Sequence, residues 1–109
     1  MKEVLKIAYD ALDEKKGENI KIIDISGVSI IADYFIIANG TNSNQLDALT
    51  ENVEEKLAKA GVTAGRFEGM NTDWRLLDYG DIVIHIFTRD TREFYDLERI
   101  WSDGKEVEV

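Results

Sequence analysis

His85 is the only histidine of the chain, and it is the first residue whose side chain could take part in acid–base catalysis. Asp81 falls on the same face of a predicted strand, so its carboxylate could orient the imidazole as a general base. No nucleophile in a recognisable setting accompanies the pair. A structural histidine, hydrogen-bonded in or beside the core, is therefore the favoured interpretation.

The segment 39–45, with the sequence NGTNSNQ, precedes a predicted helix whose free backbone N–H groups could hold a phosphate. It has neither a Gly-x-Gly-x-x-Gly pattern nor a Gly-Lys-Ser/Thr sequence, so a helix cap is favoured, with Asn42 and Thr41 as competing caps. Asp24 and Asp33 could ligate a divalent metal, but they are not a same-face pair, and solvated carboxylates are favoured. We therefore expect no metal and no cofactor.

Acidic residues surround two aromatic residues between positions 68 and 81. Acidic side chains alone usually indicate a solvated surface. Acidic side chains interleaved with aromatic ones favour a recognition surface, because Trp and Tyr are preferred anchors of protein interfaces. We expect Trp74 and Tyr79 to be the energetic anchors. The residues of this group are Glu68, Asp73, Trp74, Asp78, Tyr79 and Asp81.

This group lies on or beside a predicted β-hairpin, 74–87, which has the densest apolar content of the chain. The first strand is 74–79 and the second is 81–87. The tip is Tyr79-Gly80, where glycine tolerates the positive φ that short hairpin loops require. Alternate positions place large apolar groups on both faces of both strands. The hairpin therefore needs cover on both sides, from helices or from another chain.

Apolar periodicity and turn residues predict the other elements. The order predicts an α/β (α+β) fold, in which a mixed β-sheet of about five strands is flanked by helices. We expect one domain over 1–103, followed by a short polar tail, 104–109, and frayed structure from 102 onward. The predicted helices are 2–16, 43–60 and 91–101, with Phe94, Leu97 and Trp101 aligned on the last, and the further strands are 20–25, 33–38 and 63–67.

Composition excludes several classes of site. The chain has 109 residues, a net charge of -9 and no cysteine, which excludes disulfides, thiolate zinc sites and cysteine nucleophiles. The acidic surface repels phosphate backbones, so we expect no direct nucleic-acid binding, and it favours basic partners. The N-terminal segment predicts neither a signal peptide nor a membrane span. We expect a soluble cytoplasmic protein that does not bind a membrane.

The hairpin and the residues around it carry a combined motif that covers about 2–103. The motif consists of Asp33-Tyr34-Phe35, Gly40-Thr41-Asn42, Gln45, Glu68-Gly69, Trp74–Asp81, Val83, His85-Ile86-Phe87, Arg92, Phe94-Tyr95, Leu97-Glu98, Trp101 and Asp103. This combination resembles the Iojap/RsfS family of ribosomal silencing factors.

The resemblance implies a fold similar to that of the nucleotidyltransferases, without their activity; no Asp-x-Asp follows Gly40-Thr41, so no enzyme is expected. It implies binding to the large ribosomal subunit through its protein fourteen, a steric block of small-subunit joining and repression of translation. It also implies a homodimer when the protein is free. The partner-binding residues carried over are Glu68, Trp74, Leu76, Leu77, Asp78, Tyr79 and Asp81.

Two alternatives remain open from the sequence. One is a nucleotide-binding or nucleotidyltransferase-like domain that uses the segment 39–45. The other is a plain dimerisation module, in which the two-sided apolar hairpin serves only self-association.

Overall fold

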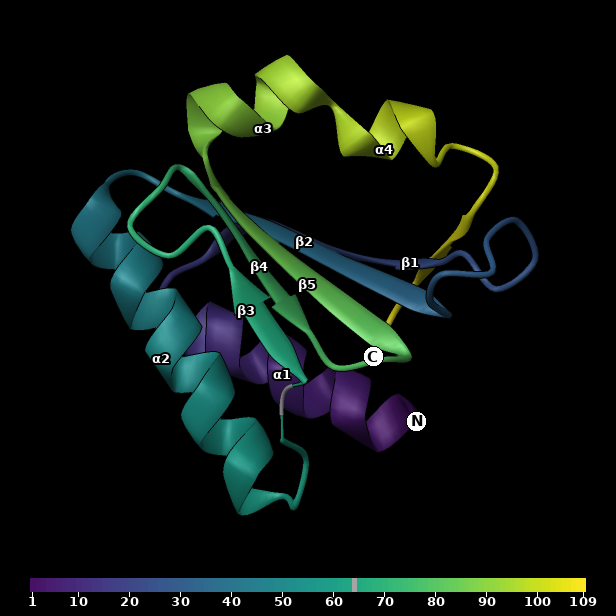
Figure 1. The fold of residues 1–109 in the computed structure, drawn as a ribbon, viewed down its shortest axis with the longest axis horizontal. Helices are drawn as coiled ribbons and strands as arrows, with labels where there is room; N and C mark the ends of the chain where they lie inside the picture. The colour runs from purple at the N-terminus through teal and green to yellow at the C-terminus, as the bar shows by residue number, and fades with distance from the viewer. Residues whose placement is uncertain (64) are drawn as a thin grey trace.

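The computed structural model describes residues 1–63 and 65–109, and it shows a six-stranded sheet with helices on both faces (Figure 1). The predicted mixed sheet flanked by helices is confirmed. No helix in these ranges has both the length and the apolar character that crossing a membrane requires. The elements are α1 (Lys2–Glu14), β1 (Glu18–Asp24), β2 (Tyr34–Gly40), α2 (Ser43–Lys59), β3 (Arg66–Glu68), β4 (Trp74–Asp78), β5 (Ile82–Thr88), α3 (Arg89–Tyr95), α4 (Leu97–Ile100) and β6 (Lys105–Val107).

The strands lie in the order β3-β4-β5-β2-β1-β6. The central pair, β2 and β5, is parallel, and every other pair is antiparallel. β2 and β5 are buried along almost their whole length, as expected of strands with cover on both faces. The predicted hairpin forms as β4 and β5, and Gly80 in its turn has a φ of 87°.

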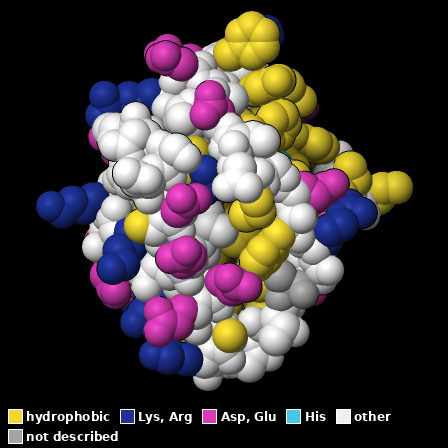
Figure 2. Space-filling view, turned by 60° about the vertical axis from the view of Figure 1, so that its left-hand side comes forward, with side chains coloured by type: hydrophobic (Ala, Val, Ile, Leu, Met, Phe, Trp, Pro, Cys, Tyr) yellow, Lys and Arg dark blue, Asp and Glu magenta, His cyan; other side chains and the backbone are white. Residues whose placement is uncertain are grey.

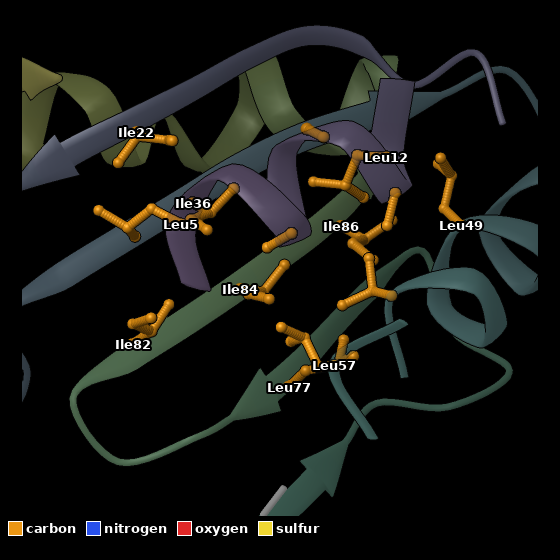
Figure 3. Close-up of a cluster of buried hydrophobic side chains, with 14 of the residues drawn as sticks. Leu5, Leu12, Ile22, Ile36, Leu49, Leu57, Leu77, Ile82, Ile84 and Ile86 are labelled. Carbon is orange, nitrogen blue, oxygen red and sulfur yellow. The ribbon is translucent and has the colours of Figure 1, made fainter. Parts of the chain in front are cut away.

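α1 and α2 cover one face of the sheet and form the larger core (Figure 3). Gln45 ties the two helices together, because its side-chain Nε2 donates to the carbonyl oxygens of Lys15 and Lys16, at 3.3 and 2.9 Å. The fully buried residues that meet in this core include Leu5, Leu12, Ile22, Ile36, Leu49, Leu57, Leu77, Ile84 and Ile86.

α3 and α4 cover the opposite face and form a smaller core (Figure 1). Both helices are short, and α3 packs on β5 and β2. Trp74 and Leu76 of β4 are therefore only half-buried at the side of this core. The apolar character of both hairpin faces is confirmed. The buried residues of this second core are Ile23, Ile25, Ala32, Phe35, Ile37, Val83 and Phe87.

Three predicted elements differ from the structure. The strand predicted over 63–67 is β3, Arg66–Glu68, and position 64 of that prediction lies outside the described residues. The predicted helix 91–101 is two helices, because Asp96 adopts a left-handed conformation (φ 48°, ψ 53°) that an α-helix cannot contain. The frayed segment from 102 onward instead includes β6, which pairs with β1 and places Val107 opposite Ile22. The sheet therefore has six strands, and its last strand lies in the predicted polar tail.

Candidate protein-binding surface

Trp74 begins β4, and contacts on several sides fix its ring. The indole stacks on Phe87 of the neighbouring strand, with 5.1 Å between ring centroids, and lies 4.6 Å from the ring of Tyr95 in α3. Its Nε1 donates a hydrogen bond of 3.1 Å to Nδ1 of His85. The ring is nonetheless only half-buried, so one part of a rigidly held indole is open to a partner.

His85 is buried and acts as the hydrogen-bond acceptor for Trp74. Burial lowers the pKa of His85 to about 4, so the imidazole is neutral at physiological pH. Because Nδ1 accepts the indole N–H, the imidazole proton lies on Nε2, which has no hydrogen-bond partner among the described residues. Asp81 is exposed, roughly 13 Å away along the strand. The contacts support the structural interpretation of His85.

The sheet divides the seven predicted partner-binding residues between its faces. Side chains alternate along β4, so Trp74, Leu76 and Asp78 share the face of the second core. Glu68 pairs with Leu76 in the register of β3 and β4, and joins them on that face. We call these four residues the β4 face. Leu77 points the other way and is fully buried in the larger core.

Tyr79 lies with the larger core, on the opposite side of the sheet from Trp74. Its ring is 6.4 Å from that of Phe67, and its hydroxyl is buried without a hydrogen-bond partner among the described residues. Burial, and then the charge of Glu54, raise the pKa of Tyr79 to about 12. Trp74 is also at the end of β4 away from Gly80. The two predicted anchors therefore cannot contact one partner surface together at the hairpin tip.

A hollow with a volume of about 640 Å³ lies between the start of β4 and α3. Phe94 lines it and is 80% exposed, although the sequence predicted Phe94 on the same side of one long helix as Leu97 and Trp101. The break at Asp96 separates Phe94 from the other two residues, while Leu97 and Trp101 still pack on the second core. Figure 2 shows hydrophobic side chains gathered in a band on one face of the molecule. The hollow is lined by Thr72, Asp73, Trp74, Asp90, Thr91, Phe94 and Tyr95.

The segment 39–45 forms a helix cap. Oδ1 of Asn42 accepts a hydrogen bond from the backbone N–H of Gln45 at 2.9 Å. Oε1 of Gln45 accepts from the backbone N–H and from the hydroxyl of Thr41, at 2.7 and 3.0 Å. This reciprocal arrangement confirms the capping interpretation, with Asn42 as the cap. It also occupies two backbone N–H groups near the start of the helix, those of Thr41 and Gln45.

Asp24 lies opposite Tyr34 in the register of β1 and β2, so Asp33, the residue before Tyr34, falls at the alternate position. Oδ1 of Asp24 accepts from the hydroxyl and from the backbone N–H of Ser26, at 2.6 and 2.9 Å, and these bonds hold the pKa of Asp24 below its ordinary value. Within residues 1–63 and 65–109, no group of three His, Cys, Asp or Glu side chains is arranged to hold a metal ion.

Comparison with known proteins gives consistent matches. The family described as ribosomal silencing factor during starvation, RsfS, matches residues 1–109. Ribosomal silencing factor RsfS of Bacillus subtilis is 38% identical over 104 residues, covering 94% of this chain and 88% of that protein. A crystal structure from Chromobacterium violaceum has a TM-score of 0.91 at 34% identity, covering 99% of this chain and 90% of that chain. A mouse protein named mitochondrial assembly of ribosomal large subunit protein 1 is 28% identical over 95 residues, 84% of this chain but 42% of that protein. The chain belongs to the RsfS family of ribosomal silencing factors.

Proposed function

We propose that this chain binds the large ribosomal subunit through its ribosomal protein fourteen, prevents the small subunit from joining and so represses translation. Membership of a family of ribosomal silencing factors supports a role at the ribosome. The name of the mouse relative, which refers to the large subunit, supports the choice of subunit. The mechanism is steric and needs no reaction: a folded domain occupies a surface that the other subunit must cover.

The observation that carries the proposal is the β4 face. α3 and α4 leave Trp74 and Leu76 half-buried, with the acidic Glu68 and Asp78 on the same face. An aromatic and an aliphatic group with a polar rim have the composition of a protein interface. The net charge of -9 favours encounter with a basic ribosomal protein and disfavours contact with bare RNA.

The other three expected residues take different roles in the proposal. Leu77 supports the β4 face from within the larger core, because it is fully buried. Asp81 is exposed in the hairpin turn and provides an acidic flank. Tyr79 faces the larger core and acts by packing against Phe67.

The test is cosedimentation with separated large and small subunits, followed by a subunit-joining assay. The wild-type chain should pellet with large subunits and reduce joining. Trp74→Ala should weaken this binding about thirtyfold, which corresponds to about 2 kcal/mol. Ile30→Ala is the control, because Ile30 is a fully exposed apolar residue in the loop between β1 and β2. Unchanged binding by a folded Trp74→Ala variant would remove Trp74 from the interface.

Self-association is a second candidate function, because Phe94, Tyr95 and Ile100 expose apolar surface on the side of α3 and α4. A homodimer that covers Trp74 would compete with ribosome binding. Sedimentation velocity over a dilution series measures this, and large subunits should dissociate such a dimer.

A further inference from the structure

We propose that the hollow between β4 and α3 accepts a lysine or arginine side chain of the protein that covers the β4 face. The inference rests on the proposed function, because it takes that protein to be ribosomal protein fourteen. It goes further by naming the chemical group that is recognised and by including α3 residues in the interface.

The aromatic walls of the hollow are suited to a cation. Trp74 is held by Phe87 and His85, so its ring position is set before any partner arrives. The ring centroid of Tyr95 is 4.6 Å from that of Trp74, and Phe94 stands perpendicular to Tyr95 at 5.1 Å. Aromatic ring faces attract ammonium and guanidinium groups within about 6 Å. Phe87 and Tyr95 lie against the indole of Trp74, so the ring surface open to a cation is mainly that of the exposed Phe94 and Tyr95. The same rings offer apolar surface for the aliphatic stem of a basic side chain.

The hollow is also lined by two carboxylates that form no salt bridge within the described part of the chain. They belong to Asp73 and Asp90, which are both exposed. The nearby arginines have salt-bridge partners outside the hollow. Arg75 is buried and pairs with Asp47, and Arg92 pairs with Glu98. Arg89 pairs with Glu18, although Asp90 also helps to raise the pKa of Arg89.

This combination distinguishes between possible occupants. An apolar side chain in the hollow would desolvate two carboxylates without offering them a hydrogen bond or an opposite charge. An acidic side chain or a phosphate would be repelled by the same carboxylates. A basic side chain can pack its cation against the aromatic rings and form an ion pair with the carboxylates. The volume of about 640 Å³ exceeds that of one side chain, so neighbouring residues of the partner segment can enter with it.

The direct test uses arginine amide as a probe and citrulline amide as a control, which keeps the α-amino group but has an uncharged ureido side chain. In an NMR titration of the ¹⁵N-labelled chain, arginine amide should shift the Trp74 indole N–H and the backbone amides of Asp73 and Tyr95. Citrulline amide should bind at least about fivefold more weakly. Equal shifts with both amides, or no saturable shift with either, would overturn the proposal. The same shifts on dilution of the chain alone would assign the hollow to a second copy, and would also overturn it.

The second test uses the double variant Asp73→Asn/Asp90→Asn and purified large subunits. It should lose roughly tenfold in affinity, with a smaller loss at high salt. Asp13→Asn/Glu14→Gln is the matched control, because it removes the same charge from exposed positions of α1, on the other side of the sheet (Figure 1), that also form no salt bridge among the described residues. If the wild-type chain binds large subunits and both double variants bind with the wild-type affinity, the hollow is excluded and the proposed function stands. If the wild-type chain takes arginine amide but does not bind large subunits, the cation site stands and the proposed function fails.

Discussion

The indole N–H of Trp74 donates a 3.1 Å hydrogen bond to Nδ1 of His85, which joins a half-buried ring to a buried one. The two residues lie on adjacent strands, since Trp74 pairs with Phe87 and Leu76 pairs with His85. The orientation of the half-buried ring is therefore set from inside the second core. His85 is thus a positioning residue for the candidate surface, although it is itself only 4% exposed.

His85→Leu should destabilise the fold by about 1–3 kcal/mol, because the indole N–H loses its acceptor while it stays partly buried. His85→Asn places an oxygen acceptor near the position of Nδ1 and should recover part of this loss. Urea unfolding measures both values. In a Trp101→Phe background, fluorescence anisotropy then reports Trp74 alone, and it should fall further in the leucine variant. Equal anisotropy in the two variants would mean that the hydrogen bond does not restrain the ring.

Stability should fall as the pH drops from about 6.5 to about 4. The pKa of His85 is lowered to about 4 by burial, whereas in the unfolded chain it is near 6.5, so the unfolded state binds the extra proton in this range. The loss should approach roughly 3 kcal/mol at the lower end. Urea unfolding at several pH values measures it.

His85→Asn is the control for this pH dependence. Glu18 and Asp24 also have lowered pKa values, but their contribution falls away in both proteins as the pH drops further, so it cancels in the comparison. If the free energy of unfolding changes with pH in the same way in the wild-type chain and in His85→Asn between pH 6.5 and 4, the role of His85 is contradicted.

Gly104→Ala should destabilise the fold by about 1–3 kcal/mol. A Cβ at this position would lie 2.6 Å from Cγ2 of Ile23 and 2.9 Å from the carbonyl oxygen of Asp24. Gly27→Ala is the matched control, since a Cβ there meets nothing within 4 Å. Thermal unfolding compares the two variants. Equal melting temperatures would mean that the segment before β6 does not pack as described.

Tyr79→Phe should leave stability unchanged or raise it by about 1 kcal/mol. The substitution removes a buried hydroxyl that has no hydrogen-bond partner among the described residues, and the ring contact with Phe67 is kept. Binding to large subunits should not change, in contrast to Trp74→Ala. Weaker binding by a fully stable Tyr79→Phe variant would show that the hydroxyl reaches a partner after all.

The sequence predicted the hairpin well, because the period-two pattern of Ile82, Ile84 and Ile86 is a local signal. It did not predict the end of α3. The helical spacing of Phe94, Leu97 and Trp101 continues across Asp96, although the left-handed conformation of Asp96 ends the helix there. It also missed β6, because a three-residue polar strand has no periodicity of its own and forms only against β1.

The hollow could not be predicted from spacing. Its walls come from residues around Trp74 and from α3, and the register of β4 with β5 brings them together. A backbone hydrogen bond of 3.0 Å from Thr88 to the carbonyl oxygen of Asp73 fixes the two sides where they meet. Asp73 and Trp74 belong to the acidic and aromatic group that the sequence predicts, whereas Asp90, Phe94 and Tyr95 of the lining do not.

Both outermost strands of the sheet, β3 and β6, are only three residues long. Such short strands offer few free backbone groups, so they are poor templates for β-augmentation or for edge-to-edge aggregation. Charged Arg66 and Glu68 on β3 oppose it further. A partner that binds by pairing its own strand with the sheet edge would therefore form few backbone hydrogen bonds. Recognition of this chain has to depend on its side chains.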